Sequence, residues 1–399
     1  MNQSTPALPA NQDLDKGDGE HKPLLTKCAG GSMASGELAA FMKPSLNWLL
    51  VFIPISVYLE HFHSHAHLWI FFSACVAIIP LAGLLGEATE HIAERTGEGI
   101  GGLLNATFGN AAELIIAIVA LRAGYIDVVK ASLTGSIIGN VLLVLGAAFL
   151  AGGFYHKIQQ FNPIAARTQA AMLILASIGL IIPALFHFLR PPHVSLNEAA
   201  ISLAIAALLI IVYALSLVFS LGTHKELFRG SVESPSGPMV HPSQPWSWQG
   251  ALLVLGVATF FIAWMSEILV GSVEQAAEAT GMSSIFVGII VVAIVGNAAE
   301  HSTAVLVAMK NRMELSFGIA IGSSTQVALF VAPFLVFLSY LIAPQPMDLV
   351  FTRGEVLAVI LSTFMMAFAA GDGRSNWFMG AQLLAVYLIF AVGFYFTPG

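Results

Sequence analysis

Two carboxylates stand inside the same five-residue sequence, Gly-Asn-Ala-Ala-Glu, at residues 109–113 and 296–300. Both copies lie in strongly apolar stretches, and in both a Gly-Ser pair begins 22 residues after the glutamate. A charged side chain at the centre of a membrane costs about 2–3 kcal/mol or more, so an acid is seldom found there without a function. The two acids, Glu113 and Glu300, therefore predict a cation site that two repeats share.

The residues around each glutamate are rich in oxygen ligands. Asn110 and Asn297 stand three residues before the two glutamates, and this spacing predicts that each pair shares one face of a helix. The segments that follow add hydroxyl and amide groups, namely Ser136, Asn140, Ser323 and Gln326. Hard oxygen ligands suit Ca²⁺, which binds about six to eight of them, whereas Zn²⁺ or Cu⁺ would favour Cys or several His. Glu113 and Glu300, as metal ligands, would balance the charge of one divalent cation.

The same two acids predict competition between Ca²⁺ and protons. Without a cation, two close carboxylates in a low dielectric cannot both remain charged, because desolvation and mutual repulsion oppose it. Protons and Ca²⁺ then compete for one site, and a site that opens to one side at a time works as an exchanger. The alternative is a pair of buried acids that only join helices, which leaves the repeat symmetry unexplained. No cofactor is expected beyond the transported Ca²⁺ and H⁺.

Composition indicates an all-α polytopic membrane protein. The 399 residues are 57% hydrophobic and 10% charged, whereas a soluble domain has about 25% charged residues. Apolar runs of sufficient length predict about eleven transmembrane helices, at 46–60, 68–89, 99–121, 126–151, 166–188, 195–221, 250–273, 284–308, 315–341, 349–370 and 377–396.

These segments predict one isolated helix followed by two five-helix repeats. The predicted parts are a cytoplasmic tail (1–45), the first extra helix (46–60), repeat 1 (68–221), a cytoplasmic linker (222–249) and repeat 2 (250–396). Because five is an odd number, the second repeat must enter the membrane upside down relative to the first. Inverted repeats of this kind are typical of secondary transporters, whose ions bind near the midplane.

Charge distribution predicts the orientation in the membrane. With the N-terminus inside, twelve Lys and Arg residues fall on the inner side and four on the outer side, so the N-terminus is predicted to be cytoplasmic. The lipid bilayer is the expected surrounding, most naturally the cell membrane of a prokaryote, or a vacuolar or other organelle membrane in a eukaryote. The sequence has no basic patch, so nucleic acid is not expected as a partner. An oligomer is possible, and the sequence leaves the oligomeric state open.

The motifs at residues 102–113 (GLLNATFGNAAE) and 296–301 (GNAAEH) closely resemble the two repeat motifs of the cation/proton exchanger (CAX) family. These are Ca²⁺/H⁺ antiporters of the Ca²⁺/cation antiporter superfamily, and the resemblance covers about residues 68–396. It implies that Glu113 and Glu300 bind the cation and that the neighbouring polar residues help or line the site, namely Asn110, Asn297, Ser136, Asn140, Ser323 and Gln326. A neutral Gln326, where related Na⁺/Ca²⁺ exchangers usually carry an acid, resembles the proton-coupled branch.

Four further residues are candidates for a proton relay or a vestibule. Glu90 and Glu274 occupy equivalent places in the two repeats, where a cation-attracting vestibule and a solvated helix end explain them equally well. Glu267 lies inside an apolar run. His301 follows Glu300 directly and could relay protons to it, but on a helix it points roughly 100° away from that acid.

The predicted function is a secondary antiporter that exchanges Ca²⁺ for H⁺ by alternating access. A Na⁺-coupled exchanger, or a broader divalent exchanger for Mn²⁺ or Cd²⁺, is the alternative among transporters. A Ca²⁺ channel on the same site is a third hypothesis, against which the inverted repeats argue. An enzyme is not expected, because the chain has no His-Glu-x-x-His zinc motif.

Overall fold

The computed structural model describes residues 46–189, 197–224 and 246–397, and these are mostly helical. The predicted tail (1–45) and most of the predicted linker (222–249) lie outside the described residues. Within these described ranges, eight helices are long and apolar enough to cross a membrane, or nine if one bent pair counts as a single span. The predicted class of an all-α polytopic membrane protein is confirmed.

The helices of the first half follow the chain with short connections. They are the 3₁₀ turn Leu46–Val51, α2 (Phe52–Phe62), α3 (His67–Phe108), α4 (Ala111–Arg122), α5 (Ile126–Ile138), α6 (Leu145–Tyr155), α7 (Pro163–Leu189) and α8 (Glu198–Leu217). The π-helical segments Gly139–Val144 and Val218–Thr223 continue α5 and α8.

The second half repeats much of this pattern. Its helices are α9 (Trp248–Thr280), α10 (Ser284–Phe286), α11 (Ala293–Gly296), α12 (Ala298–Met309), α13 (Met313–Gln326), α14 (Ala332–Ile342), α15 (Arg353–Ala370) and α16 (Trp377–Tyr395). The π-helical segments Val287–Val292 and Val327–Val331 join α10 to α11 and α13 to α14. Two short strands, β1 (Gln159–Gln160) and β2 (Arg374–Ser375), pair antiparallel.

The predicted count of eleven helices is not confirmed by the described residues. The first apolar helix, Leu46–Phe62, is short. The predicted break between residues 89 and 99 is wrong, because α3 continues unbroken over 42 residues. The residues there are polar, but Ala, Glu and Arg are good helix formers, so the apolar run ends without ending the helix. The break comes later, at residues 109–110.

Capping residues define the ends of α9 and the start of α15. The Ser247 hydroxyl accepts a hydrogen bond from the Gly250 amide at the start of α9, and Gly281, with a φ of 68°, ends that helix. Thr352 and Glu355 form a capping box at the start of α15. These residues hold backbone groups that would otherwise lack partners.

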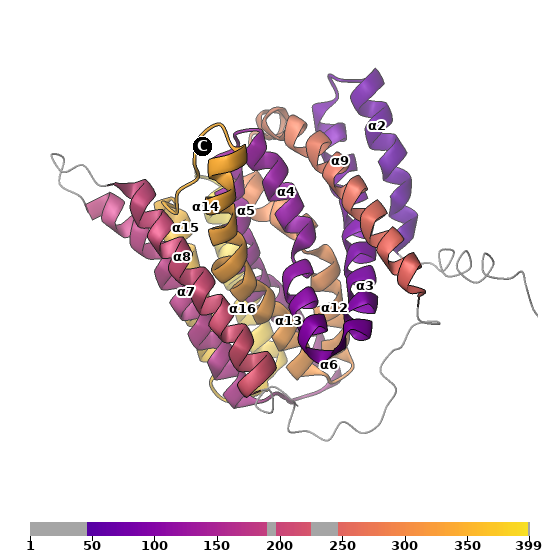
Figure 1. Ribbon diagram of the computed structural model, residues 1–399. Coiled ribbons are helices and arrows are strands. Elements are labelled where there is room, and N and C mark those ends of the chain that lie inside the picture. Colours follow the sequence, from indigo (N-terminus) through magenta and orange to yellow (C-terminus); the bar gives the residue numbers. More distant parts are fainter. Residues whose placement is uncertain (1–45, 190–196, 225–245, 398–399) are drawn as a thin grey trace, which may run out of the picture. The chain divides into compact units, whose positions relative to one another are not determined.

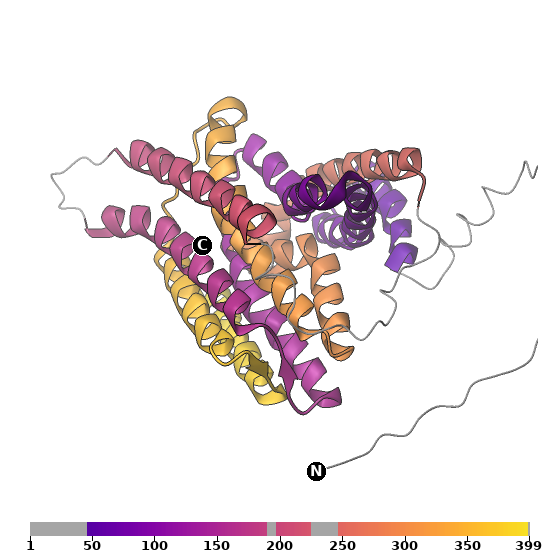
Figure 2. The ribbon, with the colours of Figure 1, turned by 60° about the horizontal axis from the view of Figure 1, so that its bottom comes forward.

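Helices from the two halves of the chain pack against each other. In Figure 1, α3 lies alongside α9, and α6 packs against α16. Figure 2 shows C-terminal helices, in yellow, next to α7, and α15 makes this contact. Helices α6 and α16 approach closely at Gly380, where an added Cβ would lie 2.3 Å from the Leu150 amide nitrogen. Small residues permit such approaches between membrane helices.

Candidate functional site

Each of the two repeated motifs lies where its helix breaks. α4 begins after residues 109–110, and α12 begins after Asn297, where the helix pair bends by 61°. Glu113 and Glu300 therefore occupy the first turns of α4 and α12, and Asn110 and Asn297 are the N-cap residues of these two helices. The partial positive charge at a helix N-terminus interacts favourably with a carboxylate.

Residues of both repeats hold the Glu113 carboxylate. Its Oε1 accepts hydrogen bonds from the Ser136 hydroxyl and from the Asn297 side-chain amide. Asn297 Nδ2 also lies 3.1 Å from Ser136 Oγ, to which it donates. An added Cβ at Gly296 would lie 3.0 Å from Glu113 Cγ, so the glycine permits this close approach. The acid of the first repeat is thus positioned by the asparagine of the second.

A second group of side chains forms a directed hydrogen-bond chain. Ser323 Oγ donates to Asn110 Oδ1 at 2.7 Å, and Asn110 Nδ2 donates to Gln326 Oε1 at 2.6 Å. Asn140 Nδ2 donates to Ser323 Oγ at 3.0 Å, and Asn140 Oδ1 lies 3.1 Å from His301 Nε2. Because Asn140 Oδ1 can only accept, His301 must donate from Nε2. His301 thus contacts the amide chain; its role in proton transfer stays a prediction.

Two carboxylate oxygens in this cluster are buried and unpartnered. Glu113 Oε2 and Glu300 Oε2 have no hydrogen-bond partner among the described residues. The two carboxyl groups are near enough to interact electrostatically, and Ser323 is the hydroxyl neighbour of Glu300. A buried polar atom without a partner is unfavourable, and a bound cation would satisfy both oxygens. Within the described part of the chain, no place brings together three or more His, Cys, Asp or Glu residues that could hold a metal ion, so the two glutamates would depend on amide, hydroxyl and backbone oxygens to complete a cation's coordination.

The structure brings eight of the predicted site residues into one polar region, and these are Asn110, Glu113, Ser136, Asn140, Asn297, Glu300, Ser323 and Gln326. The predicted vestibule acids lie apart from it. Glu90 is exposed on α3, and Glu267 and Glu274 are exposed on α9. A vestibule role for these three acids stays a prediction.

The two repeats differ in how tightly their Gly-Ser helices pack. α5 lies so close to the segment Val287–Val292 that an added Cβ at Gly135 would stand 2.0 Å from the Ile289 carbonyl oxygen. Among the described atoms, none lies within 4 Å of a Cβ added at the equivalent Gly322. The backbone of α5 is therefore in close contact with Val287–Val292, and no equally close contact of α13 is seen among the described residues.

This difference predicts opposite effects of two matched substitutions on stability. Gly135→Ala should lower the free energy of unfolding by about 1–3 kcal/mol, because the added methyl group meets backbone that cannot move aside. Gly322→Ala should leave stability unchanged or raise it by up to about 1 kcal/mol, because alanine favours the helix. Thermal unfolding of both variants in detergent tests this. Equal unfolding temperatures would contradict the packing difference.

Lys130, on the helix that carries Ser136, was counted from the sequence only as one of the four outer-side charges. Lys130 of α5 is only 9% exposed. A signal was available, since Lys130 stands inside the predicted apolar segment 126–151, and a charge within a membrane segment usually has a function.

Known proteins resemble this chain over most of its length. The model of a family described as sodium/calcium exchanger protein matches residues 66–222 and 250–396. The chain is 45% identical over 364 residues to a Ca²⁺/H⁺ antiporter of Synechocystis sp., covering 88% of this chain and 96% of that protein. It is 39% identical over 364 residues to a vacuolar calcium ion transporter of Schizosaccharomyces pombe, covering 90% and 87%. The solved structure of native YfkE matches with a TM-score of 0.76 and 39% identity, covering 88% and 100%.

Proposed function

Because this chain belongs to the sodium/calcium exchanger protein family, we infer that it is an antiporter that exchanges Ca²⁺ for H⁺ across a membrane. Curated relatives at 45% and 44% identity are named Ca²⁺/H⁺ antiporters. These names do not favour the alternatives of a Na⁺-coupled exchanger or a channel. The family consists of transporters, and the chain acts as one of them and not as an enzyme.

The cation site that we propose lies between Glu113 and Glu300. The observation that supports it most is the pair of buried, unpartnered carboxylate oxygens, one from each repeat. Ca²⁺ would bind these oxygens and complete its coordination with amide, hydroxyl and backbone oxygens nearby. Asn110 and Gln326 can take part because each side-chain carbonyl oxygen has two lone pairs, of which the hydrogen-bond chain uses one.

Proton coupling follows from the same two acids. When Ca²⁺ leaves, the close carboxylates repel each other in a low dielectric, and protons can neutralise them. When Ca²⁺ binds, it displaces those protons. The hydrogen bond from Asn297 to Glu113 crosses between the repeats, so a movement of one repeat against the other alters the site itself. Alternating access then needs no second cation site.

The proposed location follows the relatives and the charge distribution. The curated relatives include bacterial antiporters and a vacuolar transporter. The predicted excess of Lys and Arg on one side supports a cytoplasmic N-terminus. A protease added to sealed, inside-out vesicles should then cleave the tail, and protection of the tail there would contradict this orientation.

Na⁺ should not drive Ca²⁺ transport. Gln326 is a neutral amide whose oxygen already accepts from Asn110 at 2.6 Å, so the proposed site has no third acid for monovalent ions. In proteoliposomes, a pH gradient should drive Ca²⁺ uptake at the same rate with and without Na⁺. Gln326→Asp is the matching probe for gained Na⁺ sensitivity. Ca²⁺ uptake driven by a Na⁺ gradient alone would refute this proposal.

A further inference from the structure

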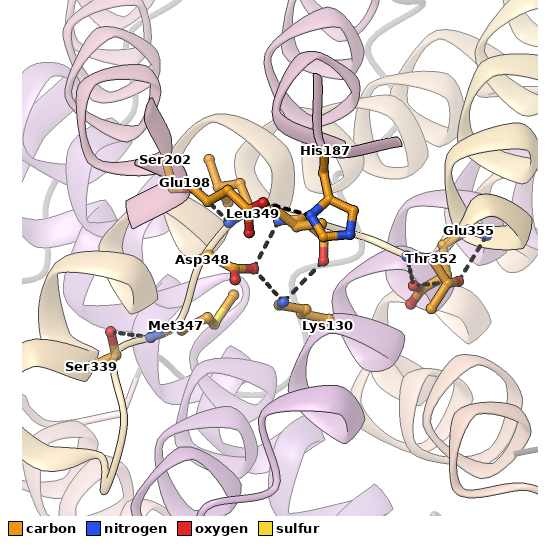
Figure 3. A network of polar contacts seen from close by, with 11 residues as sticks. Lys130, His187, Glu198, Ser202, Ser339, Met347, Asp348, Leu349, Thr352 and Glu355 are labelled. Carbon is orange, nitrogen blue, oxygen red and sulfur yellow. Dashed lines mark hydrogen bonds and ion pairs between the residues drawn. The ribbon is translucent and has the colours of Figure 1, made fainter. Parts of the chain in front are cut away.

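A polar network lies around the loop between α14 and α15, residues 343–352, and contains none of the residues proposed to bind the cation (Figure 3). The Met347 amide donates to Ser339 Oγ of α14 at 2.8 Å, and the Leu349 amide donates to Ser202 Oγ of α8 at 3.0 Å. These bonds attach the loop to two helices.

Lys130 attaches the same loop to α5. Its Nζ lies 2.5 Å from Asp348 Oδ1 and 2.9 Å from the Val350 carbonyl oxygen. Asp348 Oδ1 also accepts from the Val350 amide at 2.9 Å, which orients the carboxylate. Glu355 adds a second negative charge near the ammonium group. Lys130 is buried and Asp348 is about one third exposed, so removing Asp348 leaves the buried ammonium group with less to balance its charge.

The corresponding place in the other repeat holds an aromatic contact. The repeats are offset by 187 residues, the difference between Glu113 and Glu300, and this offset relates Lys130 to Phe317 and Asp348 to Phe161. The rings of Phe161 and Phe317 are stacked, with centroids 4.8 Å apart. An ion pair thus fixes the loop to α5, whereas an apolar stack fixes the equivalent loop to α13.

Lys130 lies on the same helix as two residues of the proposed site, so its ion pair can affect their position. Ser136 lies six residues further along the same helix, which is about 9 Å, and Asn140 lies on the π-helical segment that follows. Where α5 meets the segment Val287–Val292, the contact is formed by Gly135 and Gly288. The ion pair of Lys130 adds a polar contact on the same helix, six residues before Ser136.

We propose that Lys130 is a positioning residue for cation exchange: its ion pair with Asp348 fixes α5 against the loop and so holds Ser136 and Asn140 in place for cation binding. This inference rests on the proposed function. It assigns Lys130 an effect on cation affinity, which general destabilisation of the fold would not produce.

The test is Ca²⁺ uptake into proteoliposomes under a fixed pH gradient, measured over a range of Ca²⁺ concentrations. In Lys130→Met and in Asp348→Asn, the KM for Ca²⁺ should rise by about tenfold, within the range for coupled neighbouring residues. Vmax per folded protein should stay within about twofold of wild type, and the double variant should be no worse than either single variant. Lys130→Arg should keep the wild-type KM.

Arg353→Met is the matched control, because Arg353 is an exposed cation whose guanidinium lies over the Phe188 ring and not in this ion pair. It should leave KM unchanged. If Lys130→Met does not fold, Asp348→Asn decides. A normal KM with reduced Vmax in the folded variants would overturn the positioning role. Absence of Ca²⁺/H⁺ exchange in the wild type would instead refute the proposed function.

Discussion

Replacing Glu113 or Glu300 by glutamine is expected to abolish Ca²⁺/H⁺ exchange while the protein stays folded. Each substitution removes half of the charge that balances the ion, and the charge of the ligands sets Ca²⁺ affinity over several orders of magnitude. We expect a loss of more than about a hundredfold in exchange for each variant. Glutamine keeps the size of the side chain, so Ser136 and Asn297 can still donate to the Oε1 position of residue 113.

The measurement is Ca²⁺ uptake under a pH gradient, with thermal unfolding to verify the fold. Glu60→Gln is the matched control, because Glu60 is an exposed acid of α2, outside both proposed repeats. It should transport at the wild-type rate. Substantial exchange by either Glu113→Gln or Glu300→Gln at saturating Ca²⁺ would show that the two acids do not form one site.

Lowering the pH should weaken Ca²⁺ binding strongly. Protons and Ca²⁺ compete for the same two carboxylates, so higher proton occupancy lowers the apparent Ca²⁺ affinity. If two protons are displaced by each Ca²⁺, linkage sets the upper limit at about a hundredfold loss of affinity per unit of pH. At high pH the carboxylates are free of protons, and the affinity should reach a plateau.

A binding titration between about pH 8 and pH 5 tests this, since free glutamate stays largely ionised over that range. The slope of the logarithm of affinity against pH gives the number of protons displaced. Unchanged affinity over the whole range would mean that the glutamates do not exchange protons for Ca²⁺.

The sequence was sufficient to predict the helical membrane class, because apolar length and low charge are properties of the chain itself. It also singled out Glu113 and Glu300, since repetition of a motif needs no structure to be seen. The helix break at residues 109–110 was placed wrongly, because polarity and helix propensity give different signals between residues 89 and 99. Hydropathy indicates where a segment leaves the membrane, whereas helix propensity decides whether the helix continues beyond that point.

Side-chain contacts between the two repeats could not be predicted from the spacing of residues along the sequence. The sequence associates Asn297 with Glu300, three residues away, yet its side chain donates to Glu113, 184 residues away. The Lys130–Asp348 ion pair spans 218 residues. Spacing identifies neighbours on one helix, but partners across two repeats depend on how the helices pack. Gly135 and Gly322 look alike in sequence and differ only in what packs against them.

Protons released when Ca²⁺ binds provide the most direct test of one site shared by both ions. Purified protein in weakly buffered solution at a pH where the carboxylates are protonated would be titrated with Ca²⁺ while the pH is recorded. We predict that each bound Ca²⁺ releases protons from the wild type, and that Glu113→Gln and Glu300→Gln show neither tight Ca²⁺ binding nor this release. Stoichiometric Ca²⁺ binding without proton release at any pH would contradict the account.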